Sequence, residues 1–538
     1  MTSLTRWVFG SLVCVGLVAS PSSVYAFAES QAVFREPLLK VASESGLHAK
    51  TTVLAFYQNR GYSAAWSAAA RPSPQAREML AIMQGLKSDG LVPSNYHEAR
   101  IGDLVARGGN AALTEREAAQ LELLLTDAFI MIAAHLRHGF VDPVKIDSEW
   151  LLVHPRPALH EALDAALHDE TLRQTVESFR PPQAEYEGLV RALAWYREIA
   201  QQGGWGTVQS DSTLVLGSQG TAVLDLRSRL RATGDLEDRG EALPTIDEDL
   251  VHAVRRFQSR HGLNDDGSVG PATRAALNVS VEDRLNQILV NLERWRWLPT
   301  DLGDRHVMVN IAAFESAMVV SGRDVLNMRV IAGRTYRRTP VFSGRIQYLV
   351  FNPSWSVPAS IARKDLFPKF RKDPGEIARM GYRISAVDGS KVSPGAVDWS
   401  KPSAYRITQA PGPKNALGKV KFMFPNVHNV YLHDTSSPEL FAKEDRAFSS
   451  GCIRVEKPME LAELLLEDSD WSPERVAKGL EAGKEFRVDL PTAVPVHILY
   501  WTAWVDRDGI LQFRKDVYGR DGRVLEALAE PSPASPSR

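Results

Sequence analysis

Residues 430–455 of the chain read VYLHDTSSPELFAKEDRAFSSGCIRV. The segment opens with an apolar, β-prone run that ends at His433, and a polar loop then leads to Cys452, nineteen residues later. Such a run is typical of a β-strand. The sequence therefore predicts a strand with a histidine at its end, followed by a loop that carries a cysteine.

His433 and Cys452 are residue types that form a nucleophilic pair. A free thiol has a pKa of about 8.5, so it needs an imidazole, a helix N-terminus or a cation to become a thiolate near neutral pH. Gly451 allows close approach of the backbone to a substrate, and the amides of Gly451 and Cys452 are candidate oxyanion donors. The alternative is that the lone cysteine is a small buried hydrophobic side chain.

The same stretch resembles the active-site signature of the L,D-transpeptidases, the YkuD-type cysteine enzymes of bacterial cell walls. In that signature, a histidine precedes a short element made of a small residue, Gly, Cys, an apolar residue and Arg. The matching positions here are His433, Ser449, Ser450, Gly451, Cys452, Ile453 and Arg454. Most members have a second histidine where this chain has Ser450, whereas the large multidomain Gram-negative branch of the YcbB type has Ser-Ser-Gly-Cys. The resemblance thus favours that branch and leaves His433 as the nearby base.

The resemblance implies acyl transfer through a thioester. His433 would take the proton of Cys452, whose thiolate would attack the third residue of a tetrapeptide stem and release D-alanine. An amine of a second stem would then attack the thioester and form a 3→3 cross-link in peptidoglycan. The family implies acylation by carbapenems, and a backbone carbonyl near Asp434 as the group that orients His433. The Asp434 carboxylate is an alternative orienting group.

Four further residues are candidates for supporting roles. Tyr431 precedes His433 by two positions and shares its face of the strand, where it would line the cleft. Arg454 would bind a carboxylate of the stem peptide or form a structural salt bridge. Ser449 and Ser450 are expected to hydrogen-bond within the loop.

The sequence predicts no metal and no other cofactor. His428, His433 and Cys452 are ligand types in one region, but the chain has no Cys-x-x-Cys and no His-Glu-x-x-His motif.

Two other functions remain open from the sequence. A cysteine L,D-carboxypeptidase or peptidase of wall peptides would pass the same thioester to water. A noncatalytic peptidoglycan-binding scaffold would not need the thiol, and Cys452→Ala would then leave its function intact.

The N-terminus has the pattern of a secretory signal peptide, expected at residues 1–26. One positive charge precedes a short apolar run, and small residues lie at the cleavage positions. Cleavage would remove Cys14 and leave Cys452 as the single thiol of a periplasmic protein. An uncleaved segment would instead hold the protein at the inner membrane.

Composition indicates a soluble globular protein of about three domains. Of the 538 residues, 44% are hydrophobic and 24% are charged, and the formal net charge is -2. This charge balance argues against a nucleic-acid partner. The expected partners are peptidoglycan stem peptides and glycan, with other wall-synthesis enzymes as further candidates. No segment after the N-terminal run is expected to be long and apolar enough to cross a membrane.

Helical periodicity dominates the first half of the chain. A helical scaffold domain is expected at residues 27–210, with one helix at 158–177. Residues 211–280 contain Phe-Gln, Asp-Gly and Gly-x-x-Thr elements and resemble a three-helix peptidoglycan-binding domain of the PG_binding_1 type. An amphipathic helix at 281–304 would return to the scaffold, so the small domain would be an insertion.

The pattern changes to short β-prone runs from residue 305. A mainly antiparallel β domain of the YkuD type is expected at residues 305–490. A long segment at about 361–402 is expected to be a lid over the substrate cleft. Residues 491–529 would complete the fold with a strand and a turn, and residues 530–538 would be a disordered tail. The predicted fold class is thus multidomain, α plus β.

Overall fold

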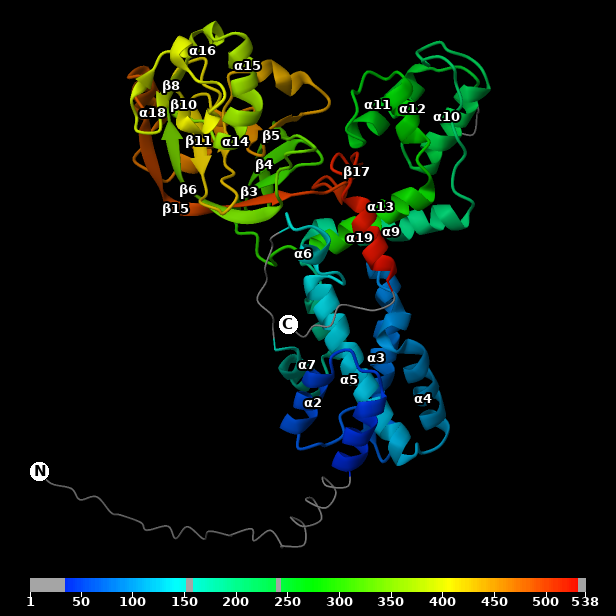
Figure 1. The fold of residues 1–538 in the computed structure, drawn as a ribbon. Helices are drawn as coiled ribbons and strands as arrows, with labels where there is room; N and C mark the ends of the chain where they lie inside the picture. Colours follow the sequence, from blue (N-terminus) through cyan, green and yellow to red (C-terminus); the bar gives the residue numbers. More distant parts are fainter. Residues whose placement is uncertain (1–33, 151–157, 239–242, 531–538) are drawn as a thin grey trace, which may run out of the picture.

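The computed structural model describes residues 34–150, 158–238 and 243–530, which form a helical body, a small helical unit and a β-rich domain (Figure 1). The expected signal peptide, including Cys14, lies outside the described residues. The expected tail also lies outside them, apart from Glu530.

The N-terminal helical body surrounds one long central helix. A short hairpin of β1 (Ser67–Ala68) and β2 (Arg71–Pro72) lies between its first helices. The helices are α2 (Lys50–Asn59), α3 (Pro74–Gly85), α4 (Glu98–Asn110), α5 (Glu115–His138), α6 (Pro143–Ile146), α7 (Leu159–His168) and α8 (Leu172–Ser178).

Helix α5 is the core of this body. Thr114 and Glu117 form a reciprocal capping box that fixes its first turn. Among the described residues it is the one helix that is long and apolar enough to cross a bilayer, and 94% of its most apolar 18-residue window is buried. The expectation that no later segment has this length and composition was therefore wrong. The apolar surface of α5 packs against the helices around it.

The helix predicted at 158–177 is divided in two. Helix α7 ends at His168 and α8 begins at Leu172, and the turn between them has Glu170 at a φ of 57°. Left-handed backbone at this residue ends the first helix. Helix α7 still packs against α2 and α5, and α8 packs against α3 and α5.

Two long helices join the helical body to the rest of the molecule. They are α9 (Ala184–Gln201) and α13 (Val281–Arg296), which pack against each other, and α19 (Asp521–Ala529) packs against α13 (Figure 1). The Glu293 carboxylate accepts a hydrogen bond of 2.7 Å from the Val141 backbone amide, just beyond α5. Helix α13 thus returns to the first body, while residues 202–280 leave it.

The small helical unit has a core of its own. It contains α10 (Thr221–Ala232), α11 (Glu248–Arg260) and α12 (Pro271–Leu277). Its buried cluster includes Leu226, Leu230 and Phe257. It rests on a hairpin near the C-terminus, formed by β16 (Ala503–Val505) and β17 (Leu511–Phe513).

A nine-stranded sheet forms the β-rich domain. Strand order is β13-β5-β14-β12-β11-β6-β15-β3-β4, and β4 also pairs with β5, so the sheet closes on itself. Its strands are β3 (Arg305–Asn310), β4 (Glu315–Val320), β5 (Arg323–Gly333), β6 (Phe342–Phe351), β11 (Val420–Met423), β12 (Leu432–His433), β13 (Ala447–Ser449), β14 (Ile453–Val455) and β15 (Phe486–Leu499).

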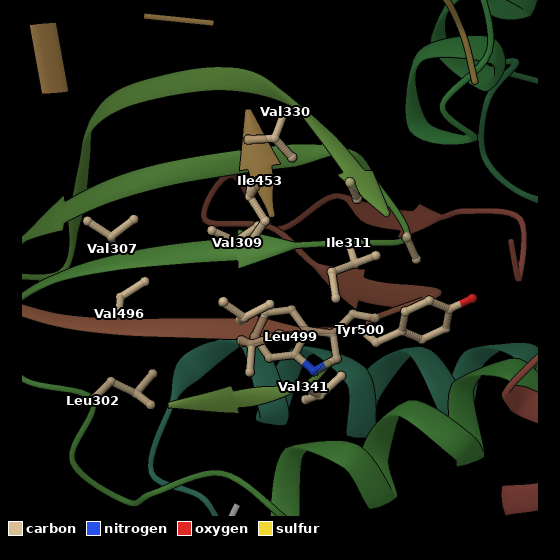
Figure 2. Close-up of a cluster of buried hydrophobic side chains, with 14 of the residues drawn as sticks. Leu302, Val307, Val309, Ile311, Val330, Val341, Ile453, Val496, Leu499 and Tyr500 are labelled. Carbon is tan, nitrogen blue, oxygen red and sulfur yellow. The ribbon is translucent and has the colours of Figure 1, made fainter. Parts of the chain in front are cut away.

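Most neighbouring strands are antiparallel, as expected, and three pairs are parallel. The parallel pairs are β12 with β14, β15 with β3, and β13 with β5. Alternate side chains point into the closed sheet, where Val309, Val330, Ile453 and Leu499 lie close together (Figure 2). This core holds β14 and the loop before it in place.

Strand β15 extends past the expected end of the catalytic region at residue 490. It pairs with β6 on one side and, through residues 496–499, with β3 on the other. The apolar run at 495–505 is therefore part of the main sheet up to Leu499. Helices α17 (Pro458–Leu466) and α18 (Pro473–Glu481) lie between β14 and β15 in the chain.

The segment expected to be a lid is a folded layer with its own sheet. Four strands pair in the order β7-β10-β8-β9, so this sheet extends beyond residues 361–402 at both ends. Its buried cluster includes Phe367, Phe370 and Ile407. The elements are β7 (Trp355–Ser356), α14 (Ala359–Ile361), η3 (Ala362–Leu366), α15 (Phe367–Lys372), α16 (Gly375–Arg379), β8 (Tyr382–Ala386), β9 (Lys391–Val392) and β10 (Tyr405–Gln409).

Candidate active site

Parallel pairing of β12 with β14 brings the predicted histidine and cysteine to one face of the sheet. In the register, Leu432 lies opposite Ile453 and His433 lies opposite Arg454. The Ile453 backbone N–H donates a 3.1 Å hydrogen bond to the Tyr431 carbonyl, which extends the register by one residue. Because side chains alternate along a strand, Leu432 and Ile453 point into the core.

The other side chains of this pairing share the opposite face. They are Tyr431, His433, Cys452 and Arg454, and the ring centroids of Tyr431 and His433 are 5.6 Å apart. Cys452 lies beside Tyr431 just before β14 begins, and His433 lies diagonally from it. The sheet thus holds the imidazole and the half-buried thiol on one face, at diagonal positions of adjacent strands.

The His433 ring is oriented by a backbone carbonyl. Its Nδ1 is 2.5 Å from the Asp434 carbonyl oxygen, so Nδ1 carries the proton and Nε2 is left as the acceptor. The Asp434 carboxylate is used elsewhere, because it accepts hydrogen bonds from the backbone amides of Lys419 and Thr435. Of the two orienting groups left open by the sequence, the structure has the carbonyl in contact with the ring.

Both members of the pair are uncharged at neutral pH. Burial, followed by the positive charge of Arg454, lowers the pKa of His433 to about 3. Burial raises the pKa of the Cys452 thiol, and hydrogen bonding to Tyr431 offsets part of that shift. The Cys452 sulfur lies 3.7 Å from the Asn429 carbonyl oxygen. A neutral imidazole can act as a general base toward a neutral thiol.

Gly451 has a backbone conformation that favours glycine. Its φ is +118°, a value that residues other than glycine rarely adopt. A Cβ at this position would lie 3.7 Å from the Arg338 carbonyl oxygen, which is ordinary contact. The backbone conformation, and not a lack of space, therefore disfavours other residues here. The carbonyl of Gly451 accepts a 2.9 Å hydrogen bond from the Thr339 hydroxyl. The conformation of Gly451 and this hydrogen bond fix the path of the backbone next to Cys452.

The two expected oxyanion donors differ in availability. The Gly451 N–H donates to the Ser449 hydroxyl oxygen at 3.1 Å. For the Cys452 N–H, the hydrogen bonds among the described residues include no acceptor. The Cys452 amide is therefore the donor that is free for a substrate, and Gly451 would have to exchange its partner.

The two serines contact different neighbours. The buried Ser449 hydroxyl donates to the Cys452 carbonyl at 2.5 Å, within the loop as expected. The exposed Ser450 hydroxyl accepts a 2.9 Å hydrogen bond from the Arg337 guanidinium. That guanidinium also contacts Asp365 of the lid layer.

Arg454 has no carboxylate partner in the described part of the chain. No salt bridge there includes it, and its buried Nε has no hydrogen-bond partner. Burial and the neighbouring charge of Arg334 lower its pKa. Of the two roles considered for Arg454, no structural salt bridge forms among the described residues, and its Nε–H is an unused donor there.

Several residues at the site were not predicted from the sequence. Arg337 and Asp365 are 28 residues apart in the chain and meet only because the lid layer folds back. Trp355 is half-buried on β7 and lies within hydrogen-bonding reach of Tyr431. The three arginines within residues 334–338 are the sequence feature that could have indicated a site for a negatively charged group.

The described residues contain one group with metal-ligand types close together, and it lies far from Cys452 in the helical body. His48, His97 and Asp127 have ligand atoms within 4.8 Å of one another. The Asp127 carboxylate already accepts hydrogen bonds from the His48 and Ala49 backbone amides and contacts His97. It thereby fixes the start of α2.

Comparison with protein families agrees with this geometry. Residues 304–492 match the model of the L,D-transpeptidase catalytic domain of the YkuD type. The chain carries an L,D-transpeptidase catalytic domain. Residues 51–193 match a scaffold domain, and residues 219–277 match a family described as "Putative peptidoglycan binding domain". The predicted fold class, helical scaffold and binding domains followed by a β-rich catalytic domain, is confirmed.

A relative with the same catalytic name is known from Haemophilus influenzae. The protein, "Putative L,D-transpeptidase", is 36% identical over 251 residues, which are 46% of this chain and 50% of that protein. The chain thus spans about half the length of this relative.

Solved L,D-transpeptidases were also found by structural comparison. The protein from Xylanimonas cellulosilytica is 16% identical, with 54% of this chain and 99% of that chain covered and a TM-score of 0.19. The protein from Stackebrandtia nassauensis is 15% identical, with 55% and 96% covered and a TM-score of 0.22. Scores of this size do not establish a shared overall fold.

Proposed function

We propose that the protein is a peptidoglycan L,D-transpeptidase that forms 3→3 cross-links, with Cys452 as nucleophile and His433 as general base. The observation that carries the proposal is the β12–β14 pairing, which places a neutral imidazole and a half-buried thiol on one face of the sheet. The match of residues 304–492 to the catalytic-domain model supports the same assignment.

The first half-reaction forms a thioester. His433 Nε2 takes the thiol proton, and the Cys452 sulfur attacks the carbonyl at the third residue of a tetrapeptide donor stem. The oxyanion is held by the Cys452 N–H, joined by Gly451 N–H if it exchanges its partner Ser449. The carbonyl reforms as the C–N bond breaks, and the imidazolium gives its proton to the departing D-alanine amine.

The second half-reaction transfers the acyl group. The side-chain amine of an acceptor stem attacks the thioester, and His433 takes the proton released by that amine. The C–S bond breaks, and the proton returns to the sulfur. The Asp434 carbonyl keeps the imidazole in the tautomer that both half-reactions require.

The other domains fit an enzyme that works on a polymer outside the cytoplasm. A domain of the peptidoglycan-binding type, docked beside the catalytic domain, would hold the glycan while stems enter the site. We therefore place the protein in the periplasm, exported by the N-terminal signal, where it would meet other wall-synthesis enzymes.

The test is a product assay with purified disaccharide-tetrapeptide. Residues 27–538 and the Cys452→Ala variant are incubated with the substrate, and the products are separated and identified by mass spectrometry. The proposal predicts cross-linked dimers and free D-alanine from the unaltered protein, and neither from the variant. Tripeptide without dimers would show a carboxypeptidase instead. Products that persist in the Cys452→Ala variant would overturn the assignment.

A further inference from the structure

A loop rich in arginine lies against the loop that carries the nucleophile. Residues 334–338 read RTYRR. The Arg334 backbone N–H donates to the Ser449 carbonyl at 3.1 Å, and the Thr339 hydroxyl donates to the Gly451 carbonyl at 2.9 Å. The arginine loop is thus fixed on both sides of Ser450, which is two residues before Cys452.

Within this loop, Arg337 contacts both the nucleophile loop and the lid layer. One terminal nitrogen donates to the Ser450 hydroxyl oxygen at 2.9 Å. Both terminal nitrogens contact the Asp365 carboxylate, with one of these distances at 3.0 Å. The two side chains are 16% and 33% exposed, so the pair is only partly open to water. Hydrogen bonds to Asp365 raise the pKa of Arg337.

This geometry is the one that a guanidinium uses to bind any carboxylate. Two parallel N–H groups meet two oxygens, which gives both strength and a fixed orientation. Asp365 reaches Arg337 from η3, which belongs to the lid rather than to the main sheet. The carboxylate is therefore supplied by a separate layer of the protein, which meets the nucleophile loop through Arg337.

The reaction proposed above brings a second carboxylate to this place. A donor stem ends in the free carboxylate of the residue that leaves, and the scissile carbonyl must lie against Cys452. Ser450, which Arg337 contacts, is two residues before Cys452. A substrate carboxylate one residue beyond the attacked carbonyl is thus close to the Arg337 guanidinium when the carbonyl is in position.

We propose that Arg337 is a specificity-determining residue that binds the C-terminal carboxylate of the donor peptide, and that Asp365 occupies this guanidinium until the donor replaces it. The inference rests on the proposed transpeptidase function and adds the group that selects donors with a free C-terminus. Exchange of one carboxylate for another keeps the Arg337 guanidinium paired, and Asp365, whose side chain is 33% exposed, is released toward water. It also frees the lid from the nucleophile loop when the donor binds.

The test compares two donors that differ only at the C-terminus. Release of the leaving residue is measured for a tetrapeptide stem that ends in a free acid and for the same stem that ends in an amide. The proteins are the unaltered chain, Arg337→Gln, Asp365→Asn and the control Asp373→Asn. Asp373 pairs with Arg379 inside the lid, away from the nucleophile loop.

The two variants at the ion pair are expected to move in opposite directions. Arg337→Gln should raise KM for the acid donor about tenfold, with a smaller change in kcat, and should bring the acid-to-amide ratio of kcat/KM close to one. Asp365→Asn removes the competing carboxylate and should lower KM for the acid donor. Asp373→Asn should leave both donors unchanged.

A purely structural role of the pair gives a different pattern. If the Arg337–Asp365 contact only holds the lid, both variants lose activity in the same direction and keep the preference for the acid donor. That result, or an unaltered acid-to-amide ratio in Arg337→Gln, would overturn the inference. Failure of the unaltered chain to release the leaving residue from either donor would instead count against the proposed function itself.

Discussion

At the scale of single residues, the site combines an uncharged histidine with an uncharged thiol. Burial is the main cause of both shifts, and Arg454, opposite His433 in the strand register, adds to the shift of the imidazole. A preformed thiolate–imidazolium pair is therefore not the resting state. In the proposed mechanism, the proton moves from the thiol to the imidazole when a carbonyl is in position, so acylation depends on general-base catalysis and not on a large resting fraction of thiolate.

The pH dependence of acylation follows from the direction of the His433 shift. The base must be neutral, so the rate falls as the pH drops through the pKa of His433. Because that pKa is lowered to about 3, the acylation rate constant should stay on its plateau well below pH 6.5. Arg454→Met removes the positive charge and should move the acid limb to higher pH. Arg475→Met on α18 is the control. An acid limb near pH 6.5 in the unaltered protein contradicts this account.

Gly451 is predicted to be required for its conformation. An alanine at a φ of +118° costs about 1–3 kcal/mol in strain, although the space beside it is open. The loop should relax and misplace the thiol, so acylation of Cys452 by a carbapenem should slow by about tenfold or more. Gly395→Ala in the lid, with no positive φ and nothing near its Cβ, should acylate at the normal rate. Equal rates in the two variants would refute the role of the loop geometry.

At the scale of elements, the sequence predicted helices and strands correctly where the apolar residues followed a single helical or β period. The helical first half and the β-prone runs from residue 305 matched their patterns, because most of these elements bury a regularly spaced set of apolar residues. The lid was expected as a long segment without strands of its own, since β10 pairs with partners 19 to 54 residues away and these short strands have no strong alternation. The register of β12 with β14 comes from tertiary packing. The His433–Cys452 pair was predicted, whereas its neighbours Arg337 and Asp365 were not.

Helix α13 contains a buried ion pair that should be critical for stability. Arg296 and Glu293 are 2% and 0% exposed, lie 3.0 Å apart, and Arg296 also hydrogen-bonds Tyr186 of α9. Arg296→Met leaves the Glu293 charge without this partner, which should cost about 3–5 kcal/mol and lower the urea midpoint of unfolding.

An exposed pair on α9 provides the control for this change. Arg191 and Glu187 are both 72% exposed, so Arg191→Met should change the unfolding free energy by about 0.5 kcal/mol or less. Similar midpoints for Arg296→Met and Arg191→Met would show that the buried pair is not needed.

At the scale of the whole molecule, the C-terminal hairpin joins the binding unit to the catalytic sheet. Phe513 of β17 is 1% exposed, its ring centroid is 5.5 Å from that of His261, and the Arg284 guanidinium lies 4.5 Å from the same ring. Arg514 also donates a 3.1 Å hydrogen bond to the Arg260 carbonyl. The small unit is thus held against the hairpin by the ring contact of His261 with Phe513 and by the Arg514 hydrogen bond, and Arg284 of α13 contacts the same ring.

Loss of the Phe513 ring should loosen this docking. Phe513→Ala removes both ring contacts, so the small unit should move away and the radius of gyration measured by small-angle X-ray scattering should increase. Cross-linking of soluble stems should fall less than cross-linking of intact sacculi, where the binding unit acts. Ile510→Ala, at a residue 47% exposed on the same hairpin, is the control. An unchanged radius for Phe513→Ala would contradict this role.

Intact-protein mass spectrometry after incubation with a carbapenem tests the central claim most directly. The unaltered chain from residue 27, Cys452→Ala and His433→Gln would be measured side by side, with folding checked by circular dichroism. The account predicts one covalent adduct on the unaltered protein, none on Cys452→Ala, and much slower formation on His433→Gln. An adduct that persists in Cys452→Ala, or no adduct on the folded unaltered protein, would contradict the assignment of Cys452 as the acylated nucleophile.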